Sequence, residues 1–315
     1  MAARPAQDPD HGETVVDVEG RRLRLRRLEK VLYPATGTTK AEVLAYVTAV
    51  APALLAQLRQ RPLTRRRWPD GVRGPSFVEK NVPRGVPGWV RSVELETPGS
   101  TKDRETARYP LVDDLAGLVW LVNLAALELH VPQWRVGPRG GVRHPDRLVV
   151  DLDPGEGAGL PECAEVALAV RERLAADGLD CHPVTSGSKG LQLYAAVSGE
   201  QSADVLRAYA HRLAEELERD RPDLVVSRMT KVLRGGKVLL DWSQNNAAKT
   251  TVAPYSPRGR ERPCAAAPRT WDEFDDPGAL RQLTLAEVAD RYARHGDPLA
   301  ALGPGAGPGP RVPTA

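Results

Sequence analysis

Residues 147–155 read Arg147-Leu148-Val149-Val150-Asp151-Leu152-Asp153-Pro154-Gly155, an apolar segment that ends in two aspartates and a turn. The aliphatic run predicts a buried strand, and Pro154-Gly155 predicts its end. Strand residues two apart point to the same face, with Cα atoms about 6.6 Å apart, so Asp151 and Asp153 can share divalent metals. An Asp-x-Asp at a strand end is equally typical of a plain Asx turn, and these residues alone leave that alternative open.

A second apolar segment also ends in an aspartate, in Val238-Leu239-Leu240-Asp241-Trp242. A third carboxylate beside an Asp-x-Asp pair is what a two-metal nucleotidyl-transfer site needs. In such a site the metals lie about 3.5–4 Å apart, activate the attacking oxygen and neutralise the leaving group. Many strands end in aspartate, so Asp241 by itself is weak support for a metal site.

A glycine-rich segment, Thr185-Ser186-Gly187-Ser188-Lys189-Gly190, lies between these two strands in the sequence. Its glycines allow close approach of the backbone, two serines offer hydroxyls and Lys189 adds a positive charge, a combination that can hold a triphosphate. It is not a Walker A loop, because the Gly-x-x-x-x-Gly-Lys-Ser/Thr spacing is absent and a strand follows it. Taken alone, the segment is also compatible with an ordinary turn.

The elements around these motifs alternate between strand and helix. The pattern predicts strands over 147–152, 191–195 and 237–242 and helices over 161–176 and 202–219, hence an α/β or α+β sheet with helices packed on it. Nearer the N-terminus it predicts a hairpin over 14–18 and 22–25, a helix over 40–58, and a helix from Asp113 or Asp114 to Leu129.

The 315-residue chain has a net charge of only +3, but the charge is unevenly distributed. Residues 1–90 contain 16 Lys and Arg against 9 Asp and Glu, a local excess of seven positive charges. Basic clusters of this kind suit phosphate partners. Arginine outnumbers lysine by 36 to 8 across the chain, so a general compositional bias is an equally good explanation of the clusters.

Cysteine spacing and hydropathy exclude other classes of protein. Three cysteines lie far apart without a Cys-x-x-Cys, so neither a disulfide framework nor a zinc site is indicated. Residues 1–10 lack the apolar core of a signal peptide. The most apolar stretch, 115–127, is shorter than the roughly 20 residues that span a bilayer. A cytoplasmic protein without a membrane partner is expected.

The motifs and their order resemble the polymerase domain of bacterial ligase D, an archaeo-eukaryotic primase-type polymerase of non-homologous end joining. Asp-Leu-Asp-Pro-Gly, Ser-Gly-Ser-Lys-Gly and Asp-Trp-Ser-Gln-Asn follow one another as in that family. The resemblance spans about residues 20–295 and includes further matching segments at 28–34, 61–64, 68–72, 127–130 and 244–255.

The resemblance implies an α+β primase-type catalytic fold with mixed and antiparallel sheets, an RRM-like palm flanked by helices. It implies one primase-polymerase domain over 13–302, with a DNA- and 5′-phosphate-binding part over 13–110 and a catalytic palm part over 111–302. The polar residues 1–12 and the Gly/Pro-rich residues 303–315 are expected to be flexible ends. Since no ligase or nuclease segment is attached, a stand-alone polymerase is expected.

By the same resemblance, three aspartates bind two divalent metals, manganese or magnesium, and serve catalysis: Asp151, Asp153 and Asp241. The residues expected to bind the incoming nucleotide are His130, Ser186, Lys189, Arg234, Gln244 and Arg258. His130 is expected to close the helix that precedes it, where a simple cap or surface residue is the alternative, and Arg258 can equally be a surface arginine.

The family's pocket for the 5′-phosphate of a broken end uses two lysines ten residues apart, and Lys30 and Lys40 have that spacing. Solvated surface lysines are the alternative. Arg66 and Phe77 match a basic residue and an aromatic residue that contact the template, and base stacking on an aromatic ring contributes about 1–3 kcal/mol.

Three positions depart from the family pattern. Gln192 stands where relatives usually have His, Val78 where they often have a second aromatic residue, and Arg27 where an Asn is common. None of the three departures removes a metal ligand.

The resemblance implies a template-dependent nucleotidyltransferase that fills short gaps and extends ends at DNA breaks, with NTP or dNTP as substrate and a preference for ribonucleotides. Expected partners are DNA ends with a 5′-phosphate, Ku and a separate DNA ligase, in the bacterial cytoplasm at the nucleoid. The alternatives are a primase-polymerase that starts chains de novo and a non-catalytic module that binds DNA ends.

Overall fold

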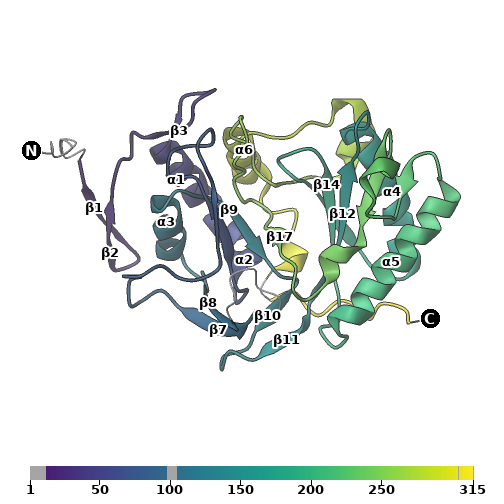
Figure 1. The fold of residues 1–315 in the computed structure, drawn as a ribbon, viewed down its shortest axis with the longest axis horizontal. Helices are drawn as coiled ribbons and strands as arrows, with labels where there is room; N and C mark the ends of the chain where they lie inside the picture. The colour runs from purple at the N-terminus through teal and green to yellow at the C-terminus, as the bar shows by residue number, and fades with distance from the viewer. Residues whose placement is uncertain (1–11, 98–104, 304, 315) are drawn as a thin grey trace, which may run out of the picture.

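A computed structural model describes residues 12–97, 105–303 and 305–314, and these form an α+β fold (Figure 1). The α-helices are α1 (Lys40–Ala49), α2 (Ala51–Leu58), α3 (Leu115–Asn123), α4 (Leu160–Ala176), α5 (Ala203–Asp220) and α6 (Leu285–His295). Short 3₁₀ helices are η1 (Lys231–Arg234), η2 (Trp242–Asn245), η3 (Trp271–Phe274), η4 (Pro277–Ala279) and η5 (Ala300–Leu302).

A six-stranded sheet forms the second half of the molecule. Its order is β15 (Val225–Val226), β16 (Val238–Asp241), β12 (Arg147–Pro154), β14 (Leu191–Ala196), β13 (Cys181–Thr185) and β18 (Ala267–Pro268). All neighbours pair antiparallel except β15 and β16, which are parallel. The segments predicted as strands from the aspartate motifs, β12 and β16, are adjacent in this sheet.

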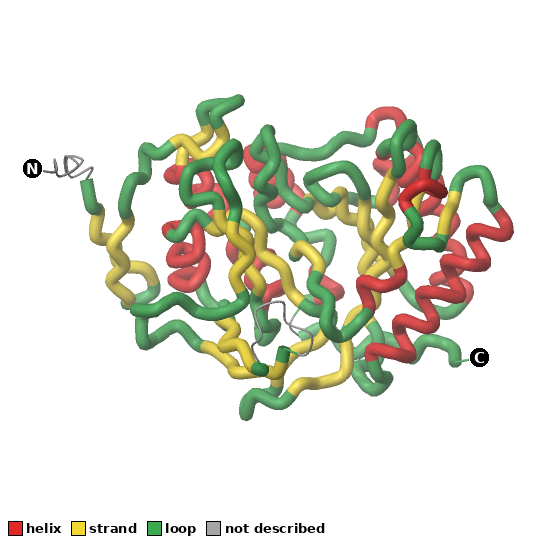
Figure 2. The backbone as a smooth tube through the Cα atoms, in the orientation of Figure 1, coloured by secondary structure: helices red, strands yellow, loops and turns green. Residues whose placement is uncertain are grey.

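The two faces of β12 pack against different parts of the protein. Leu148, Val150 and Leu152 belong to a buried cluster with α4 and α5, which cover one face of the sheet (Figure 2). Val149 belongs to the other buried cluster, which the sheet shares with the N-terminal half. Because side chains alternate along a strand, Asp151 lies on the Val149 face, away from the two helices.

A four-stranded antiparallel sheet lies between the two halves of the chain. Its order is β17 (Thr251–Val252), β9 (Ala126–Val131), β5 (Thr64–Arg67) and β6 (Phe77–Glu79). The remaining strands form two-stranded pairs: β1 (Thr14–Val18) with β2 (Arg21–Leu25), β3 (Val31–Tyr33) with β4 (Thr38–Thr39), β7 (Ser92–Glu96) with β8 (Thr106–Pro110), and β10 (Trp134–Val136) with β11 (Val142–Pro145). The four-stranded sheet joins residues on both sides of position 110.

The helix predicted over 40–58 is two helices. Thr39 caps the first with a capping box to Glu42, as its sequence indicates, but α1 and α2 meet at Val50 at an angle of 79°. A proline lies in the first turn of α2, where a missing backbone N–H costs nothing. Among the described residues no single helix is long and apolar enough to cross a membrane; only this bent pair reaches the required length.

The helix predicted to run to Leu129 ends at Asn123, and that part of the prediction is wrong. Asp114 caps α3 as expected, but Ala125 adopts a left-handed conformation with φ +57°, and the chain continues as the strand β9. The apolar residues of 124–131 satisfy a helical pattern as well as a strand buried on both faces, so periodicity alone did not separate them. His130 therefore lies on a strand and closes no helix.

The C-terminal segment is docked where it is described, so the prediction of a flexible tail is wrong there. Val312 is 2% exposed, and its backbone N–H and carbonyl pair with the side chain of Gln201 at 2.8 and 2.9 Å. A Cβ on Gly309 would lie 2.2 Å from the carbonyl oxygen of Ala196, so a glycine lets the tail approach β14. The predicted flexible N-terminal segment 1–12 lies outside the described residues except for Gly12.

Candidate active site

Three carboxylates meet on the central sheet. Asp151 is the direct cross-strand partner of Asp241 in the β12–β16 pair, and Asp153 follows two residues along β12. One carboxylate oxygen from each of the three lies within 4.8 Å of the others. Asp151 and Asp241 are each 8% exposed, whereas Asp153 is exposed. The structure thus brings the predicted metal ligands together.

The electrostatics of this cluster favour a bound cation. Burial, followed by the negative charge of Asp153, raises the pKa of Asp151, and burial with the charge of Asp241 raises the pKa of Asp153. Lys249 is a cation near the cluster, with its Nζ 3.6 Å from Asp241. A divalent cation removes the repulsion, and carboxylate oxygens are its preferred ligands. The donor set fits magnesium or manganese and does not select between them.

Neighbouring polar groups hold Asp241 and Asp151 in position. The backbone N–H of Ser243 donates to Asp241 Oδ1 at 3.0 Å, and Gln244 Nε2 donates to Oδ2 at 3.0 Å. Gln192, the residue that departs from the family histidine, donates from Nε2 to Asp151 Oδ1 at 3.0 Å. The Gln192 amide thus directs a hydrogen-bond donor toward the Asp151 carboxylate.

The glycine-rich loop lies against the end of β12. A Cβ on Gly190 would lie 2.1 Å from the Leu152 carbonyl oxygen, and one on Gly187, at φ +67°, would lie 2.6 Å from the Ala265 carbonyl oxygen. Gln282 braces the loop by accepting from Gly187 N at 2.6 Å and donating to Gly190 O at 3.1 Å. Both glycines are therefore needed for close packing.

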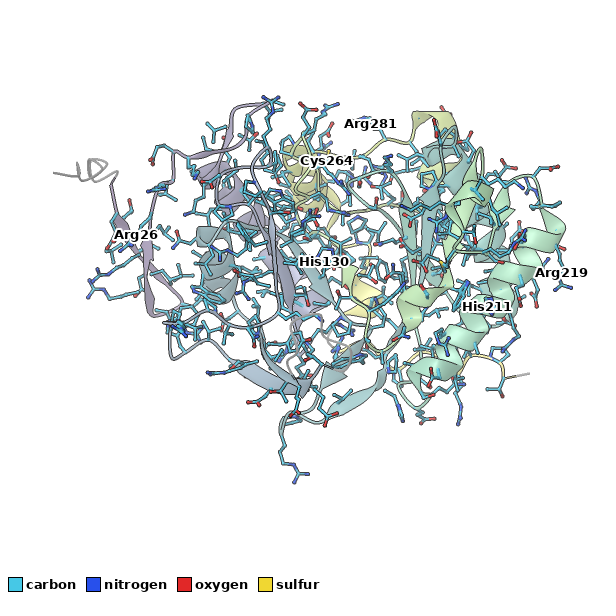
Figure 3. The ribbon with its side chains drawn as sticks, in the orientation of Figure 1. Arg26, His130, His211, Arg219, Cys264 and Arg281 are labelled. Carbon is cyan, nitrogen blue, oxygen red and sulfur yellow. The ribbon has the colours of Figure 1, made fainter. Side chains whose placement is uncertain are left out.

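A cleft of about 460 Å³ contains most of the predicted nucleotide-binding residues. Ten of its lining residues are predicted site residues or belong to the aspartate and glycine-rich motifs or their neighbours: His130, Asp151, Asp153, Ser186, Ser188, Lys189, Gly190, Gln192, Gln244 and Arg258. Thr250, Thr251 and Val252, which also line it, lie in the matching segment 244–255. His130 reaches the cleft from β9 and lies near the centre of the molecule in Figure 3. The cleft therefore joins the carboxylates to the glycine-rich loop.

Arg258 is 8% exposed, so it is not the ordinary surface arginine that was the alternative. Its Nε donates to Glu128 Oε1 at 3.3 Å, and its Nη1 donates to the Ser186 carbonyl oxygen. Burial disfavours charge on Glu128, but the charge of Arg258 and the hydrogen bonds from Arg258 and from Gly259 N together outweigh burial and lower the pKa of Glu128. Arg258 thus carries its charge beside the glycine-rich loop with a fixed orientation.

His130 is a neutral side chain at physiological pH. Burial lowers its pKa to about 4, against the attraction of Glu128, whose Oε2 lies 3.8 Å from His130 Nε2. A neutral imidazole still has one N–H for a phosphate oxygen.

Glu128, Thr250, Thr251 and Arg260 were not predicted as site residues, although the first three lie in the matching segments 127–130 and 244–255. The last three line the cleft, and Glu128 orients Arg258. On a strand, residues two apart point to the same face, so Glu128 and His130 share a face of β9. The sequence did not reveal this, because residues 124–129 were predicted to be helical. Arg260 lies two residues after Arg258 and carried no separate signal.

Arg234 is placed differently from the other nucleotide-binding candidates. It ends η1, does not line the cleft, and donates from Nη2 to the Met229 carbonyl oxygen at 2.5 Å. Its backbone lies against Gly155, and its charge opposes the rise in the pKa of Asp153. Its position is beside the carboxylates rather than among the phosphate-facing groups.

Lys30 and Lys40 are brought together by the β3–β4 turn, with Lys40 N donating to Lys30 O at 2.8 Å. Lys30 Nζ contacts Asp70 Oδ1 at 3.0 Å, and the Lys40 ammonium donates to Arg26 O at 2.6 Å and Asn123 Oδ1 at 2.8 Å. Burial, then the charges of Lys30 and Arg27, lower the pKa of Lys40 to about 8. These lysines are not two independent surface residues.

Arg66 and Phe77 lie on adjacent strands of the four-stranded sheet. Phe77 and Val78 on β6 are 50% and 59% exposed, and Val78 is the cross-strand partner of Arg66. The Arg66 guanidinium lies 4.8 Å from the Trp68 ring centroid and its Nε donates to Ser76 Oγ at 2.9 Å. Phe77 is the cross-strand partner of Arg67, so its exposed ring and the oriented Arg66 guanidinium are available to a nucleic-acid strand from opposite faces of the sheet.

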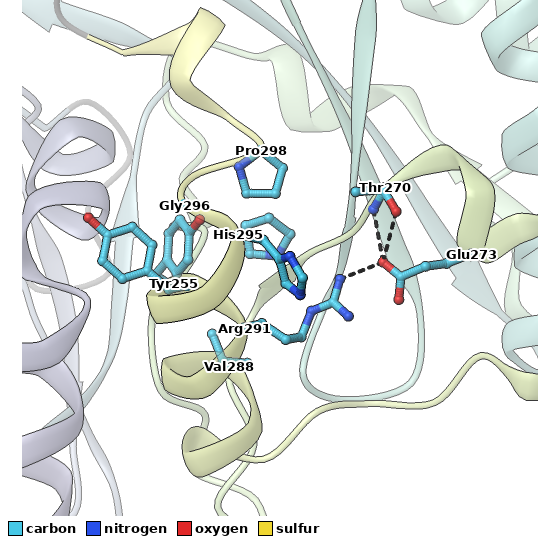
Figure 4. Close-up of a pocket in the computed structure, with 10 residues that line it drawn as sticks. Tyr255, Thr270, Glu273, Val288, Arg291, His295, Gly296 and Pro298 are labelled. Carbon is cyan, nitrogen blue, oxygen red and sulfur yellow. Dashed lines mark hydrogen bonds and ion pairs between the residues drawn. The ribbon is translucent and has the colours of Figure 1, made fainter.

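Another cavity, of about 180 Å³, lies between α6 and η3 and contains none of the predicted site residues. Figure 4 shows Arg291 and Thr270 both directed at Glu273 across it. Glu273 and Arg291 in its lining are thus paired with each other.

The sequence of this chain is similar to those of known proteins. The family model for the LigD primase-polymerase domain matches residues 39–299. The multifunctional non-homologous end joining DNA repair protein LigD of Mycobacterium tuberculosis H37Rv is 50% identical over 287 residues, covering 89% of this chain and 37% of that protein. The bifunctional non-homologous end joining protein LigD of Bacillus subtilis is 31% identical over 278 residues, covering 88% of this chain and 43% of that protein.

A solved structure, the polymerase domain from Mycobacterium tuberculosis ligase D in complex with DNA, matches with a TM-score of 0.84 and 49% identity. The match covers 89% of this chain and 98% of that one. The chain spans less than half the length of the curated relatives above. The expected family and the α+β primase-type fold are confirmed, and with them the coarse class of a nucleotidyltransferase. The chain belongs to the LigD primase-polymerase domain family.

Proposed function

We propose that this chain is a template-dependent polymerase that fills short gaps and extends ends at DNA breaks during bacterial non-homologous end joining. The observation that carries the proposal is the meeting of three carboxylates, a glycine-rich loop and the buried Arg258 in one cleft of about 460 Å³. The relatives' names support the end-joining role, and the solved relative in complex with DNA supports DNA as the partner.

The cleft residues bind and orient the incoming triphosphate. Lys189 and the Ser186 hydroxyl lie on the glycine-rich loop, and His130 faces them from β9. Arg258 holds the loop through the Ser186 carbonyl and adds positive charge. Asp151, Asp153 and Asp241 would hold divalent cations, for which the family resemblance favours manganese. Bound there, the cations would supply positive charge for the transferred phosphoryl group and lower the pKa of the attacking hydroxyl. Positioning and charge account for most of the rate enhancement.

The N-terminal part of the chain, residues 13–110, binds the DNA. Lys30 and Lys40 bind the 5′-phosphate at the far side of a gap, Arg66 contacts the template backbone and Phe77 stacks on a base. The exposed Phe77 ring and the paired lysines support this role. A ribonucleotide preference and cooperation with Ku and a separate ligase in the cytoplasm belong to the same proposal.

The proposal is tested by primer extension on a duplex with a short 5′-phosphorylated gap, comparing NTP with dNTP and manganese with magnesium. We expect addition limited by the gap length, faster with NTP, and dependent on the metal. The same assay on bare single-stranded template without primer detects de novo initiation, and product there favours the primase alternative. Binding of the 5′-phosphorylated gap without any addition would identify a non-catalytic end-binding module.

A further inference from the structure

A cavity of about 140 Å³ lies at the opposite end of β12 from the aspartates. Arg147, the first residue of β12, lines this cavity, whereas Asp153 is six positions further along the strand. At about 3.3 Å per residue the two ends are roughly 20 Å apart. The cavity shares no lining residue with the nucleotide cleft, so it is a separate site.

The charges that line the cavity are not balanced. Arg61 Nη2 and Arg135 Nε contact the two carboxylate oxygens of Asp146 at 2.6 and 2.7 Å. Arg147, 2% exposed, donates instead to two neutral amide oxygens, Gln133 Oε1 at 2.6 Å and Gln57 Oε1 at 3.0 Å. Three guanidiniums therefore line the cavity with one carboxylate.

Two of these guanidiniums also retain unused hydrogen-bond donors. Arg61 Nε and Arg147 Nη2 are buried and have no hydrogen-bond partner in the described structure. Burial, then repulsion by Arg147, lowers the pKa of Arg61 to about 9. Excess positive charge is costly in a protein interior, and an oxyanion in the cavity offsets it through charge-assisted hydrogen bonds to the guanidinium groups that line it.

The C-terminal segment lines the cavity on its other side. Gly303, Gly305 and Gly307 are among the lining residues, and the segment that contains them is fixed downstream by the Val312–Gln201 pair and by Ser198 N donating to Pro310 O at 3.0 Å. This packing leaves a cavity of about 140 Å³, which has room for a small ion. It also gives the glycine-rich C-terminal segment a structural role that its composition did not reveal.

We propose that this cavity binds a small free oxyanion of the phosphate class through Arg61, Arg135 and Arg147. Inorganic phosphate and pyrophosphate share the required chemistry, and pyrophosphate is the product of nucleotide addition. The site holds the ion independently of extension, at the end of the sheet remote from the carboxylates. Its assignment does not depend on the proposed function.

The test is calorimetric titration of inorganic phosphate, and separately pyrophosphate, into the full chain carrying Lys30→Ala and Lys189→Ala, which remove phosphate contacts elsewhere. We expect one bound ion per chain, with affinity reduced at least tenfold by Arg147→Met. Arg135→Gln, at a side chain that is 19% exposed, is the second variant in case the first does not fold. Asp146→Asn removes the competing carboxylate and is expected to increase affinity.

Arg173→Gln removes an exposed arginine on α4 and serves as the matched control for net charge, with affinity unchanged. Equal binding by the parent, Arg147→Met and Arg135→Gln proteins would overturn the site, as would the absence of binding. Displacement of phosphate by a short 5′-hydroxyl oligonucleotide, which has only diester phosphates, would assign the cavity to nucleic acid and contradict the free-ion proposal. The phosphate-to-pyrophosphate affinity ratio identifies the preferred ion.

Discussion

Asp151 and Asp241 are direct cross-strand partners in the β12–β16 pair, so two carboxylates lie side by side in a buried part of the sheet. Like charges directly opposite each other destabilise a strand pair. Asp153, two residues after Asp151 on β12, adds a third negative charge to this pair. A cluster that costs stability in the metal-free protein is typical of a site built for a cation.

Asp153→Ala is expected to reduce extension by roughly 10³-fold, because it removes one charge-stabilising ligand from the cluster. Asp153 is the exposed member, so the fold and DNA binding are retained. Primer extension and a gel-shift assay measure the two effects. Asp180→Ala, which removes a side chain that is 88% exposed, is the control and keeps full activity. Near-normal extension by Asp153→Ala contradicts the metal assignment.

Gly190→Ala is expected to displace the glycine-rich loop, because a Cβ there lies 2.1 Å from the Leu152 carbonyl oxygen. The expected cost is about 1–3 kcal/mol of unfolding free energy, as for other overpacked sites, with a higher KM for the nucleotide. Denaturant unfolding and extension kinetics measure both. Gly141→Ala, where a Cβ meets nothing within 4 Å, provides the control. An unchanged KM in Gly190→Ala shows that the loop does not hold the nucleotide.

The preference for a 5′-phosphate is expected to weaken above about pH 8. Burial and the neighbouring positive charges lower the pKa of Lys40 to about 8, so its ammonium is charged below that pH and loses its proton above it. The ratio of Kd values for 5′-hydroxyl and 5′-phosphate gaps, measured from pH 6.5 to 9.5, reports the change. Lys40→Gln is expected to give a low ratio without this pH dependence, and a pH-independent ratio in the parent protein refutes a role for Lys40.

Lys30→Ala is expected to remove the preference for 5′-phosphate over 5′-hydroxyl gaps. Asp70→Asn is expected to have the opposite effect, because Asp70 Oδ1 lies 3.0 Å from Lys30 Nζ and competes with the phosphate. Fluorescence titration with both gapped duplexes distinguishes the variants. If neither substitution alters the ratio, the phosphate is bound elsewhere.

His130 is expected to make the protein less stable at acid pH. Burial lowers the pKa of His130 to about 4, so between about pH 6.5 and pH 4 the unfolded chain binds a proton that the folded chain does not. Unfolding free energy therefore falls as pH falls through this window, by about 1–2 kcal/mol after allowance for partial exposure. His130→Gln is expected to lack this component when urea unfolding is compared at pH 7 and pH 4.5. An identical pH dependence in both proteins excludes the buried neutral histidine.

The aspartates at the ends of the apolar strands β12 and β16 could be predicted from the sequence. Strand alternation and turn residues depend only on neighbouring positions in the chain. Asp151 and Asp153 needed only their own strand and Pro154-Gly155 to be placed on one face. That Asp241 is the direct partner of Asp151 depends on the register between β12 and β16, which no local pattern specifies. Here the family resemblance supplied what the local sequence did not.

The errors occurred where two conformations have similar local preferences. Residues 124–131 suit either a helix or a fully buried strand, and pairing of β9 with β5 and β17 decides for the strand. The segment after residue 302 has the composition of a free tail, yet Val312 is buried beside α5. Partners distant in sequence determined both outcomes.

The brace between Gln282 and the glycine-rich loop fixes the order in which the site can be completed. The loop residues leave the ribosome long before Gln282, and Ala265, whose carbonyl lies against Gly187, also follows much later. Because synthesis proceeds from the N-terminus, the nascent chain carries the carboxylates and the loop before it carries the groups that hold the loop in place. The support of the loop is therefore completed late in translation, and a chain interrupted before Gln282 lacks the hydrogen bonds that brace the loop.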